Sequence, residues 1–223
     1  MNDKVKYLIA LPKSLMFCFR VFPFCTAIKV PMLVSLDTKL YGCKKNSIEL
    51  INKASFGQVR IGFWEGAGRM GYKQKTILNI DKNALLVLGK NICVAKGSVI
   101  RVISGGGECT LMDDFKGNYG LKIMCRKSVT FGKNSLIAWD CTFTDGDGHQ
   151  LLNDGIRVND DEKIYIGDNC WICAESAVLK GSEIPSNSVV GYGTIVNKKF
   201  KENNILILGR PGRVVKNNVD WRI

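Results

Sequence analysis

The C-terminal half of the sequence repeats with a period of six residues. From Ile166 onward every sixth residue is β-branched and aliphatic: Ile166, Ile172, Val178, Ile184, Val190 and Val196. Two residues before each of them, from the second onward, stands a small residue: Cys170, Ser176, Ser182, Ser188 and Thr194. An α-helix returns apolar residues every three or four positions and a simple strand every two, so neither explains this period. A unit of one short strand and one turn does, and such units stack into a prism-shaped parallel β-helix.

The same period appears in two stretches upstream. One consists of Leu88, Val94 and Ile100, preceded two residues earlier by Leu86, Ile92 and Ser98. The other consists of Cys125, Phe131, Ile137 and Phe143, preceded by Ile123, Val129, Ser135 and Cys141. Glycine, asparagine and aspartate occupy the intervening positions, as expected for turns. We therefore expect an all-β chain built as a parallel β-helix.

The repeat loses its register at two places. The step from Ile100 to Cys125 is 25 residues, one more than a multiple of six, and the glycine-rich segment 104–120 within it predicts an irregular coil or turn. The step from Phe143 to Ile166 is 23 residues, one fewer than a multiple of six. At the second break we expect the chain to leave the prism and to return to it.

This second break predicts a projecting loop at 145–163, and loops on a rigid scaffold often carry binding and catalytic groups. The loop holds the single histidine of the chain, His149, with Asp145 and Asp147 shortly before it. A histidine accepts protons near neutral pH, and a neighbouring carboxylate can orient its ring. The residue types alone are more typical of a plain turn in which the aspartates are loop formers.

The net charge of +12 suggests an anionic partner, although a solvated basic surface accounts for most of it. No zinc-finger spacing or RNA-binding signature accompanies the charge, so we expect no nucleic acid. The cysteine count, nine, is odd for a disulfide scaffold and indicates reduced thiols and a cytoplasmic protein. One CxxC pair, Cys170 and Cys173, has no second pair with which to bind zinc, and we expect both thiols to pack in the core.

The N-terminal segment is apolar but is broken by prolines and by Lys13, Arg20 and Lys29. No run approaches the roughly 18 apolar residues that a spanning helix needs. We expect a packed extension over residues 1–57. Its mixture of apolar and basic residues is also typical of a peripheral membrane contact, which would place a cytoplasmic protein at the inner membrane surface.

The hexads from 164 to 196, which read IGDNCW-ICAESA-VLKGSE-IPSNSV-VGYGTI between Ile166 and Ile195, resemble those of the hexapeptide-repeat acyltransferases. The resemblance implies a left-handed parallel β-helix, here over 58–200, followed by a tail, 201–223, that contributes to a coenzyme A site. It also implies a homotrimer and an enzyme that transfers an acetyl group from acetyl-CoA, with no metal.

Sugar-modifying members of this family carry Trp-Asp, a few further residues and then Asp-x-Asp-x-His. Here the same pattern stands at Trp139-Asp140 and at Asp145, Asp147 and His149. The resemblance implies that His149 is the general base and that Asp147 or Asp145 assists it. Trp139 and Asp140 would line the sugar site, although Trp139 is equally typical of core packing. The implied acceptor is a sugar hydroxyl of a bacterial surface polysaccharide or of its precursor.

The resemblance also implies a donor site. Trp-Ile-Cys-Ala at 171–174 resembles the family's Trp-Ile-Gly-Ala, and the Ala174 N–H would face the oxyanion of the reacting thioester. The segment 209–213, Gly-Arg-Pro-Gly-Arg, resembles the family's Gly-x-Pro-Ala-Lys, and basic residues suit the phosphates of coenzyme A. The basic segment 198–201 is equally typical of a solvated turn. The predicted donor residues are Trp171, Ala174, Gly191, Lys198, Arg210, Pro211 and Arg213.

Two alternatives stay open at this point. One is an amino-sugar N-acetyltransferase, because the same base serves an amine, and the other is a non-catalytic scaffold or carbohydrate-binding trimer. A zinc enzyme like the γ-type carbonic anhydrases is excluded, because that site needs three histidines and the chain has one. A nucleotidyltransferase is not expected, because no glycine-rich nucleotide-binding unit precedes the repeats.

Overall fold

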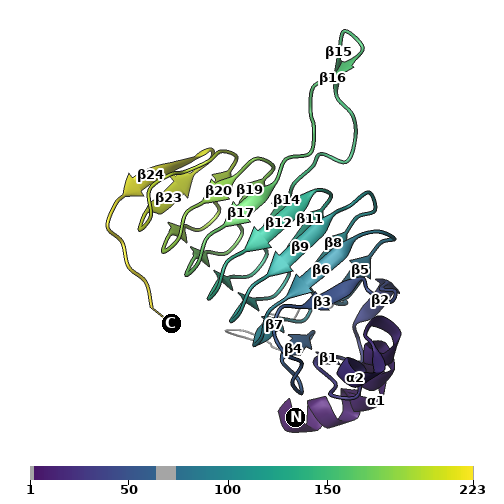
Figure 1. The fold of residues 1–223 in the computed structure, drawn as a ribbon. Coiled ribbons are helices and arrows are strands. Elements are labelled where there is room, and N and C mark those ends of the chain that lie inside the picture. The colour runs from purple at the N-terminus through teal and green to yellow at the C-terminus, as the bar shows by residue number, and fades with distance from the viewer. Residues whose placement is uncertain (1–2, 64–73, 223) are drawn as a thin grey trace.

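The computed structural model describes residues 3–63 and 74–222, and shows a left-handed parallel β-helix with helices at one end (Figure 1). The all-β prediction and its architecture are therefore confirmed. Three sheets form the sides of the prism, and the chain visits them in turn. The first sheet consists of β1 (Met32–Val34), β4 (Val59–Ile61), β7 (Ile92–Val94), β10 (Lys116–Gly117), β13 (Leu136–Ile137), β18 (Trp171–Ile172), β21 (Val189–Val190), β23 (Leu206–Gly209) and β24 (Gly212–Lys216).

The other two sheets are wholly parallel. The second consists of β2 (Lys39–Gly42), β5 (Ile77–Ile80), β8 (Val99–Val102), β11 (Lys122–Cys125), β14 (Thr142–Thr144), β19 (Ala177–Leu179) and β22 (Ile195–Val196). The third consists of β3 (Ile48–Leu50), β6 (Leu85–Leu88), β9 (Glu108–Leu111), β12 (Ser128–Phe131), β17 (Ile164–Ile166) and β20 (Glu183–Ile184).

The core contains the residues that the hexads predict. All six aliphatic positions from Ile166 to Val196 are fully buried, as are the small residues that precede them. Three phenylalanines stack in the middle of the prism: the rings of Phe115 and Phe131 lie 5.0 Å apart and those of Phe131 and Phe143 4.7 Å apart, both edge to face. Each coil therefore buries its apolar side chains against the next coil, which is how a solenoid is stabilised.

The coils differ in length. The strand pairs Ile100–Ile123, Ile123–Phe143, Phe143–Val178 and Val178–Val196 give successive coils of 23, 20, 35 and 18 residues. Between β5 and β22, equivalent positions on the third and first sheets are six residues apart along the chain. The same distance separates equivalent positions on the first and second sheets. All extra residues in this part lie where the second sheet passes to the third. We call this edge of the prism the loop corner, and the edge between the first and second sheets the Trp corner.

Two local predictions were wrong, and the loop corner explains both. Segment 104–120 is not irregular, because it contains β9 and β10, each paired on both sides. The extra residues precede β9. Cys125 does not hold the aliphatic position of its coil: Ile123 pairs with Ile100 and Phe143, while Cys125 pairs with Val102. The loop corner after β11 contains two extra residues. The distance from Ile123 to Phe131 is therefore longer than the six residues of a regular hexad.

The prism extends beyond the predicted bounds of 58–200 at both ends. At its start, β1, β2 and β3 pair in parallel with β4, β5 and β6, so a full coil precedes residue 58. Near its end, β23 pairs in parallel with β21, and β24 then folds back antiparallel to β23. The N-terminal extension is correspondingly shorter than 1–57, and the tail 201–223 begins as part of the prism.

The N-terminal extension consists of α1 (Asp3–Val21) and α2 (Phe24–Ala27), and α1 packs against β1. The Ser14 hydroxyl accepts a hydrogen bond of 2.9 Å from the Val34 N–H. The Lys13 ammonium donates to the carbonyls of Ser35, Leu36 and Thr38 at 2.6–2.9 Å. The extension is therefore packed, as predicted. Neither helix in the described ranges has the length and apolarity needed to cross a membrane.

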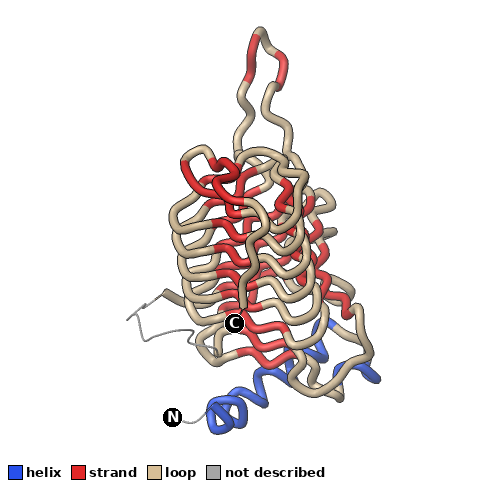
Figure 2. The backbone as a smooth tube through the Cα atoms, turned by 90° about the vertical axis from the view of Figure 1, so that its left-hand side faces the viewer, coloured by secondary structure: helices blue, strands red, loops and turns tan. Residues whose placement is uncertain are grey.

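Two segments leave the prism. Residues 145–163 project from the loop corner as a long excursion with a short hairpin, β15 (Leu152–Asn153) and β16 (Ile156–Arg157), at its tip (Figure 1). The C-terminal segment runs back over the outside of the coils toward the N-terminal end (Figure 2). It is held there by a 2.9 Å bond from the Val219 N–H to the Asn204 carbonyl.

Candidate active site

Asp145 anchors the root of the projecting loop. The residue is fully buried. Its two carboxylate oxygens accept hydrogen bonds of 2.7 Å from the backbone N–H groups of Arg126, Lys127 and Ser128 in the preceding coil. The returning arm of the loop is tied to the same residue, because the Glu162 N–H donates to the Asp145 carbonyl at 2.9 Å. A carboxylate with three backbone donors suits an anchor, and Asp145 is therefore fully engaged by the backbone.

Gly146 and Gly148 alternate with Asp145, Asp147 and His149, and the local structure explains both glycines. A Cβ atom on Gly146 would lie 2.2 Å from an Asp161 carboxylate oxygen, so a side chain does not fit in the neck of the loop. Gly148 has a φ of +81°, in the region that favours glycine. The loop is therefore closely packed at its root.

Asp147 lies beyond this neck and is held by two donors. The Lys180 ammonium donates to it at 2.6 Å and the Asn159 side-chain amide at 2.8 Å. These hydrogen bonds, that from Lys180 first, lower the pKa of the Asp147 carboxyl below its usual value. Lys180 belongs to the next coil, at the end of β19, so this pair fastens the loop to the prism one coil further along.

His149 is exposed, and its backbone is fixed by the same asparagine. The Asn159 amide donates to the His149 carbonyl at 2.8 Å, and the Asn159 side-chain oxygen accepts from the Leu151 N–H at 2.7 Å. Within the described ranges the imidazole ring makes no hydrogen bond to the protein. The backbone of His149 is thus fixed on the loop, and both ring nitrogens are free of hydrogen bonds to the described residues.

Asn159 and Lys180 together fasten the loop to the prism, and we call this arrangement the clasp. The sequence analysis singled out neither residue. Asn159 is buried although it lies in an otherwise exposed loop, and nothing in its neighbourhood in the sequence marks it. Lys180 stands in a Lys-Gly-Ser stretch that reads only as a turn. Both act through contacts between segments that are far apart in the sequence, which a motif does not record.

Trp139 and Asp140 do not join His149 within one chain. They lie at the Trp corner, while the loop begins at Asp145 on the other side of β14. Five residues of extended chain separate the two corners by roughly 16 Å. Trp139 is half-buried, and Asp140 adopts a φ of +56° against Gly120 of the preceding coil. A site that uses both His149 and Trp139 would therefore need two chains.

Ala174, Gly191 and Arg210 also lie at the Trp corner. The Gly193 N–H donates to the Ala174 carbonyl at 2.9 Å, and the Arg210 Nε donates to the Gly193 carbonyl at 2.6 Å. The Ala174 N–H itself has no acceptor among the described residues, and Ala174 is buried. A Cβ atom on Gly191 would lie 1.8 Å from the Leu208 side chain, which explains the glycine there by packing.

A tyrosine and a carboxylate add to the polar character of this corner. Tyr192 is exposed and its phenol is hydrogen-bonded to Glu175, which raises the pKa of Tyr192. Glu175 has a φ of +59°, in line with Asp140 one coil earlier. The Trp corner thus offers several exposed polar groups on a rigid edge of the prism.

Trp171 lies on the outer face of the first sheet and is partly covered by the C-terminal segment. The rings of Trp171 and Trp221 are 6.1 Å apart, and the Trp221 indole N–H donates to the Asn169 carbonyl at 2.8 Å. Trp221 is a further aromatic residue that the sequence reasoning did not single out.

A basic pocket near the C-terminal end of the prism brings two predicted donor residues together. Its volume is about 660 Å³, and Lys198, Lys199, Lys201 and Arg213 line it together with Phe200. The Lys198 ammonium lies 5.3 Å from the centre of the Phe200 ring, within cation–π range. Arg210 and Pro211, which are joined by a cis peptide bond, do not line it. The structure therefore divides the predicted basic residues between this pocket and the Trp corner.

The cysteines take structural positions. All nine are free thiols. Cys170 is buried and Cys173 partly buried, and burial raises the pKa of each thiol to about 11. Both are therefore protonated near neutral pH, in keeping with packing residues. Within the described ranges no three histidine, cysteine or acidic residues gather in a way that could hold a metal ion.

Two curated relatives resemble most of the chain. A galactoside O-acetyltransferase of Lactococcus lactis subsp. lactis is 32% identical over 198 residues, which cover 83% of this chain and 84% of that protein. An uncharacterized 24.8 kDa protein in the cps region of Klebsiella pneumoniae is 27% identical over 209 residues, which cover 92% of this chain and 87% of that protein. No protein-family model matches the chain.

A solved structure supports the fold. The polySia-specific acetyltransferase NeuO superimposes with a TM-score of 0.54 at 21% identity, over 86% of this chain and 79% of that one. The chain is similar over most of its length to a sugar O-acetyltransferase, and this agrees with its core of hexads. The chain therefore belongs to the hexapeptide-repeat family of sugar O-acetyltransferases and is an acetyltransferase.

Proposed function

We propose that this acetyltransferase moves the acetyl group of acetyl-CoA to a sugar hydroxyl during the biosynthesis of a surface polysaccharide, with His149 as general base. The observation that carries the proposal is a line of functional groups along the loop corner. Asp145, Lys180 and Lys198 follow the ends of β14, β19 and β22, which are neighbouring strands of the second sheet. His149 and the basic pocket thus lie at the same edge of the prism.

The spacing of this line fits a long donor. Adjacent coils stack about 4.8 Å apart, so two coils separate the root of the loop from Lys198 by roughly 10 Å. The phosphates of coenzyme A would lie in the basic pocket, where Lys198, Lys199 and Arg213 supply charge-assisted donors. The pantetheine arm would then extend along the corner and bring the thioester toward His149.

The chemistry needs a base that takes a proton from the acceptor hydroxyl and returns it to the leaving sulfur. His149 takes the proton of the acceptor hydroxyl while its oxygen attacks the thioester carbonyl. The C–S bond of the resulting tetrahedral intermediate breaks, and the sulfur leaves as a thiol after it takes up a proton from the imidazolium. The acceptor itself is the nucleophile, so no covalent intermediate with the enzyme forms.

We place this reaction in a cytoplasmic homotrimer. In this proposal the Ala174 N–H stabilises the oxyanion, and it lies at the Trp corner, as do Trp139 and Asp140. Three parallel prisms around a threefold axis would bring the Trp corner of one chain toward the loop corner of its neighbour. The separation of roughly 16 Å within one chain supports such a shared site.

The double substitution Lys198→Ala/Arg213→Ala tests the donor site. We expect the KM for acetyl-CoA to rise roughly 10-fold, because two partly exposed ion pairs with phosphate are lost. The kcat should stay unchanged, since these contacts are the same in the ground and transition states. Steady-state kinetics that follow release of the free thiol measure both constants.

Two controls sharpen this test. Lys122→Ala/Lys133→Ala removes the same charge from exposed residues on the prism wall and should leave the KM unchanged. Acetyl-pantetheine lacks the nucleotide, so the pocket variant should use it as well as the wild type does. An equal loss with both donors would place the nucleotide outside this pocket.

Asn159→Ala tests the clasp. The substitution removes the bonds to Asp147, to the His149 carbonyl and to the Leu151 N–H. We expect kcat to fall about 10- to 100-fold through misplacement of the base, with an unchanged KM for acetyl-CoA. Asn153→Ala, an exposed asparagine of the same loop, serves as the control. If the two variants behaved alike, Asn159 would not position His149.

A further inference from the structure

The helical end of the prism carries an apolar surface that no other part of the described residues covers. One side of α1, with Ala10, Ser14, Phe17 and Val21, is buried against the prism. The opposite side is also apolar and faces outward, with the three- and four-residue spacing of a helix stripe, and α2 continues it. We call these exposed residues the basal surface: Val5, Leu8, Ile9, Leu15, Met16, Phe19, Phe24 and Ile28.

The exposure of this surface is large. Leu8 is 69% exposed, Met16 76% and Phe24 70%. The rings of Phe19 and Phe24 lie 5.6 Å apart, so the stripe on α1 runs into α2 without a break. Contiguous exposed apolar surface of this kind marks a docking site, for a protein or for a membrane.

Basic residues predominate around the basal surface. Residues 4–31 contain five lysines and arginines and no acidic residue. Lys13 and Arg20 are engaged with backbone carbonyls of the first coil. Lys29, Lys44, Lys45 and Lys53 are exposed in the same part of the molecule. The basal surface therefore combines apolar side chains with a cationic rim.

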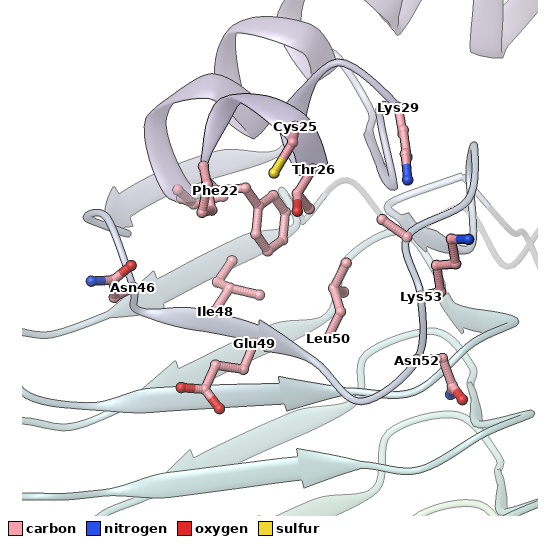
Figure 3. A pocket seen from close by; sticks show the side chains of 13 residues that line it. Phe22, Cys25, Thr26, Lys29, Asn46, Ile48, Glu49, Leu50, Asn52 and Lys53 are labelled. Atoms are coloured by element: carbon pink, nitrogen blue, oxygen red, sulfur yellow. The ribbon is translucent and has the colours of Figure 1, made fainter.

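A pocket opens beside this surface, between α2 and β3, with a volume of about 550 Å³. Phe22, Ile48 and Leu50 form its apolar interior, as Figure 3 shows. Lys29 and Lys53 lie together at one end, while the Glu49 side chain points away from the helices (Figure 3). An apolar hollow with two cations at one end is complementary to an acyl chain with an anionic head.

We propose that the basal surface binds an anionic lipid bilayer and that the pocket receives one of its lipids. The apolar stripe of α1 and α2 lies in the interface, as amphipathic helices with basic flanks do. The lipid phosphate lies between Lys29 and Lys53, and its acyl chain contacts Phe22, Ile48 and Leu50. This inference uses no residue of the acetyl transfer and stands apart from it.

Two other occupants fit the surface less well. A second copy of the chain would bring one cationic rim against another, which is unfavourable. A free amphiphile would fill the pocket but would leave Phe24 and Ile28 in water. A bilayer covers the apolar stripe and neutralises the rim at the same time.

Co-sedimentation of the full-length protein with vesicles tests the proposal. The protein should bind vesicles of phosphatidylcholine with phosphatidylglycerol and should not bind phosphatidylcholine alone. Each lysine near an anionic surface contributes about fivefold to binding, so Lys29→Gln/Lys53→Gln should weaken it roughly 30-fold. Phe24→Ser/Ile28→Ser should abolish it. Lys122→Gln/Lys133→Gln, on the prism wall, should bind as the wild type does.

A fluorophore on Cys25 reports on the pocket itself. Cys25 lines the pocket and is the only thiol classed as exposed among the nine. An environment-sensitive dye on it should shift to the blue with anionic vesicles, and brominated acyl chains should quench it. Short-chain phosphatidylglycerol below its micelle concentration and inorganic phosphate should give no comparable shift.

Three results would overturn the proposal. The first is equal binding to neutral and anionic vesicles, and the second is no binding to either. The third is loss of an oligomer in Phe24→Ser/Ile28→Ser with unchanged vesicle binding, which would assign the surface to a second copy. Because all four substituted residues are exposed, a folding defect is not expected, and circular dichroism of each variant checks this.

Discussion

Substitution of His149 by alanine should reduce acetyl transfer by about 10²- to 10⁴-fold, the usual contribution of a positioned general base. The ring has no hydrogen bond to the described part of the protein, so its removal leaves the clasp of Asn159 and Asp147 intact. The KM and the dissociation constant for acetyl-CoA should therefore stay close to those of the wild type. Thiol release with sugar acceptors, and calorimetry with acetyl-CoA, measure the two effects.

His149→Gln is the matched variant, because it keeps a polar side chain but supplies no base near neutral pH. It should be as inactive as His149→Ala. Activity retained in both variants would remove His149 from the reaction and would favour a turn role for it. If the wild-type enzyme transferred the acetyl group to an amino sugar but to no hydroxyl, the acceptor class would change, while His149 would keep its role as base.

Asp145→Ala should cause the largest loss of stability of any substitution in the loop. The change leaves the N–H groups of Arg126, Lys127 and Ser128 without their acceptor in a buried corner. Loss of a buried charged acceptor with several donors costs about 3 kcal/mol or more. For a chain of this size that lowers the Tm by roughly 6–12 °C, which differential scanning calorimetry resolves.

Asp147→Ala is the control, since it removes a carboxylate from the exposed part of the same loop. Its Tm should stay near that of the wild type, while its activity falls with the loss of the Lys180 and Asn159 contacts. Asp145→Asn, which keeps one acceptor oxygen, should fall between the two in stability. If Asp147→Ala proved the less stable variant, the anchor role of Asp145 would be contradicted.

The hexads predicted the core because burial is periodic in a β-helix. Ile166 to Val196 obey the six-residue step without exception, and each of these residues is buried where the pattern places it. The prediction was wrong where extra residues enter at the loop corner, as at Cys125. A count along the chain cannot tell a longer corner from a broken coil, because the pairing that decides between them joins residues about 20 apart.

The site was predicted only in part for a related reason. The Asp-x-Asp-x-His pattern locates the loop, but it gives Asp145 and Asp147 the same weight. Three-dimensional contacts separate them: Asp145 meets buried N–H groups, whereas Asp147 meets Lys180 and Asn159. Likewise, Trp139 is near His149 in the sequence, but the width of the second sheet separates them in space.

The unequal coils have a consequence for how such a chain can change. Between β5 and β22 all added length lies at one edge, so an insertion or deletion there leaves the ladders of all three sheets in register. A loop of another length or sequence could be exchanged at the Phe143–Ile164 junction without redesign of the core, provided that Asp145 and the proposed base His149 are kept. New acceptor preferences could thus arise by replacement of this one loop. The coils that we propose bind the donor would not change.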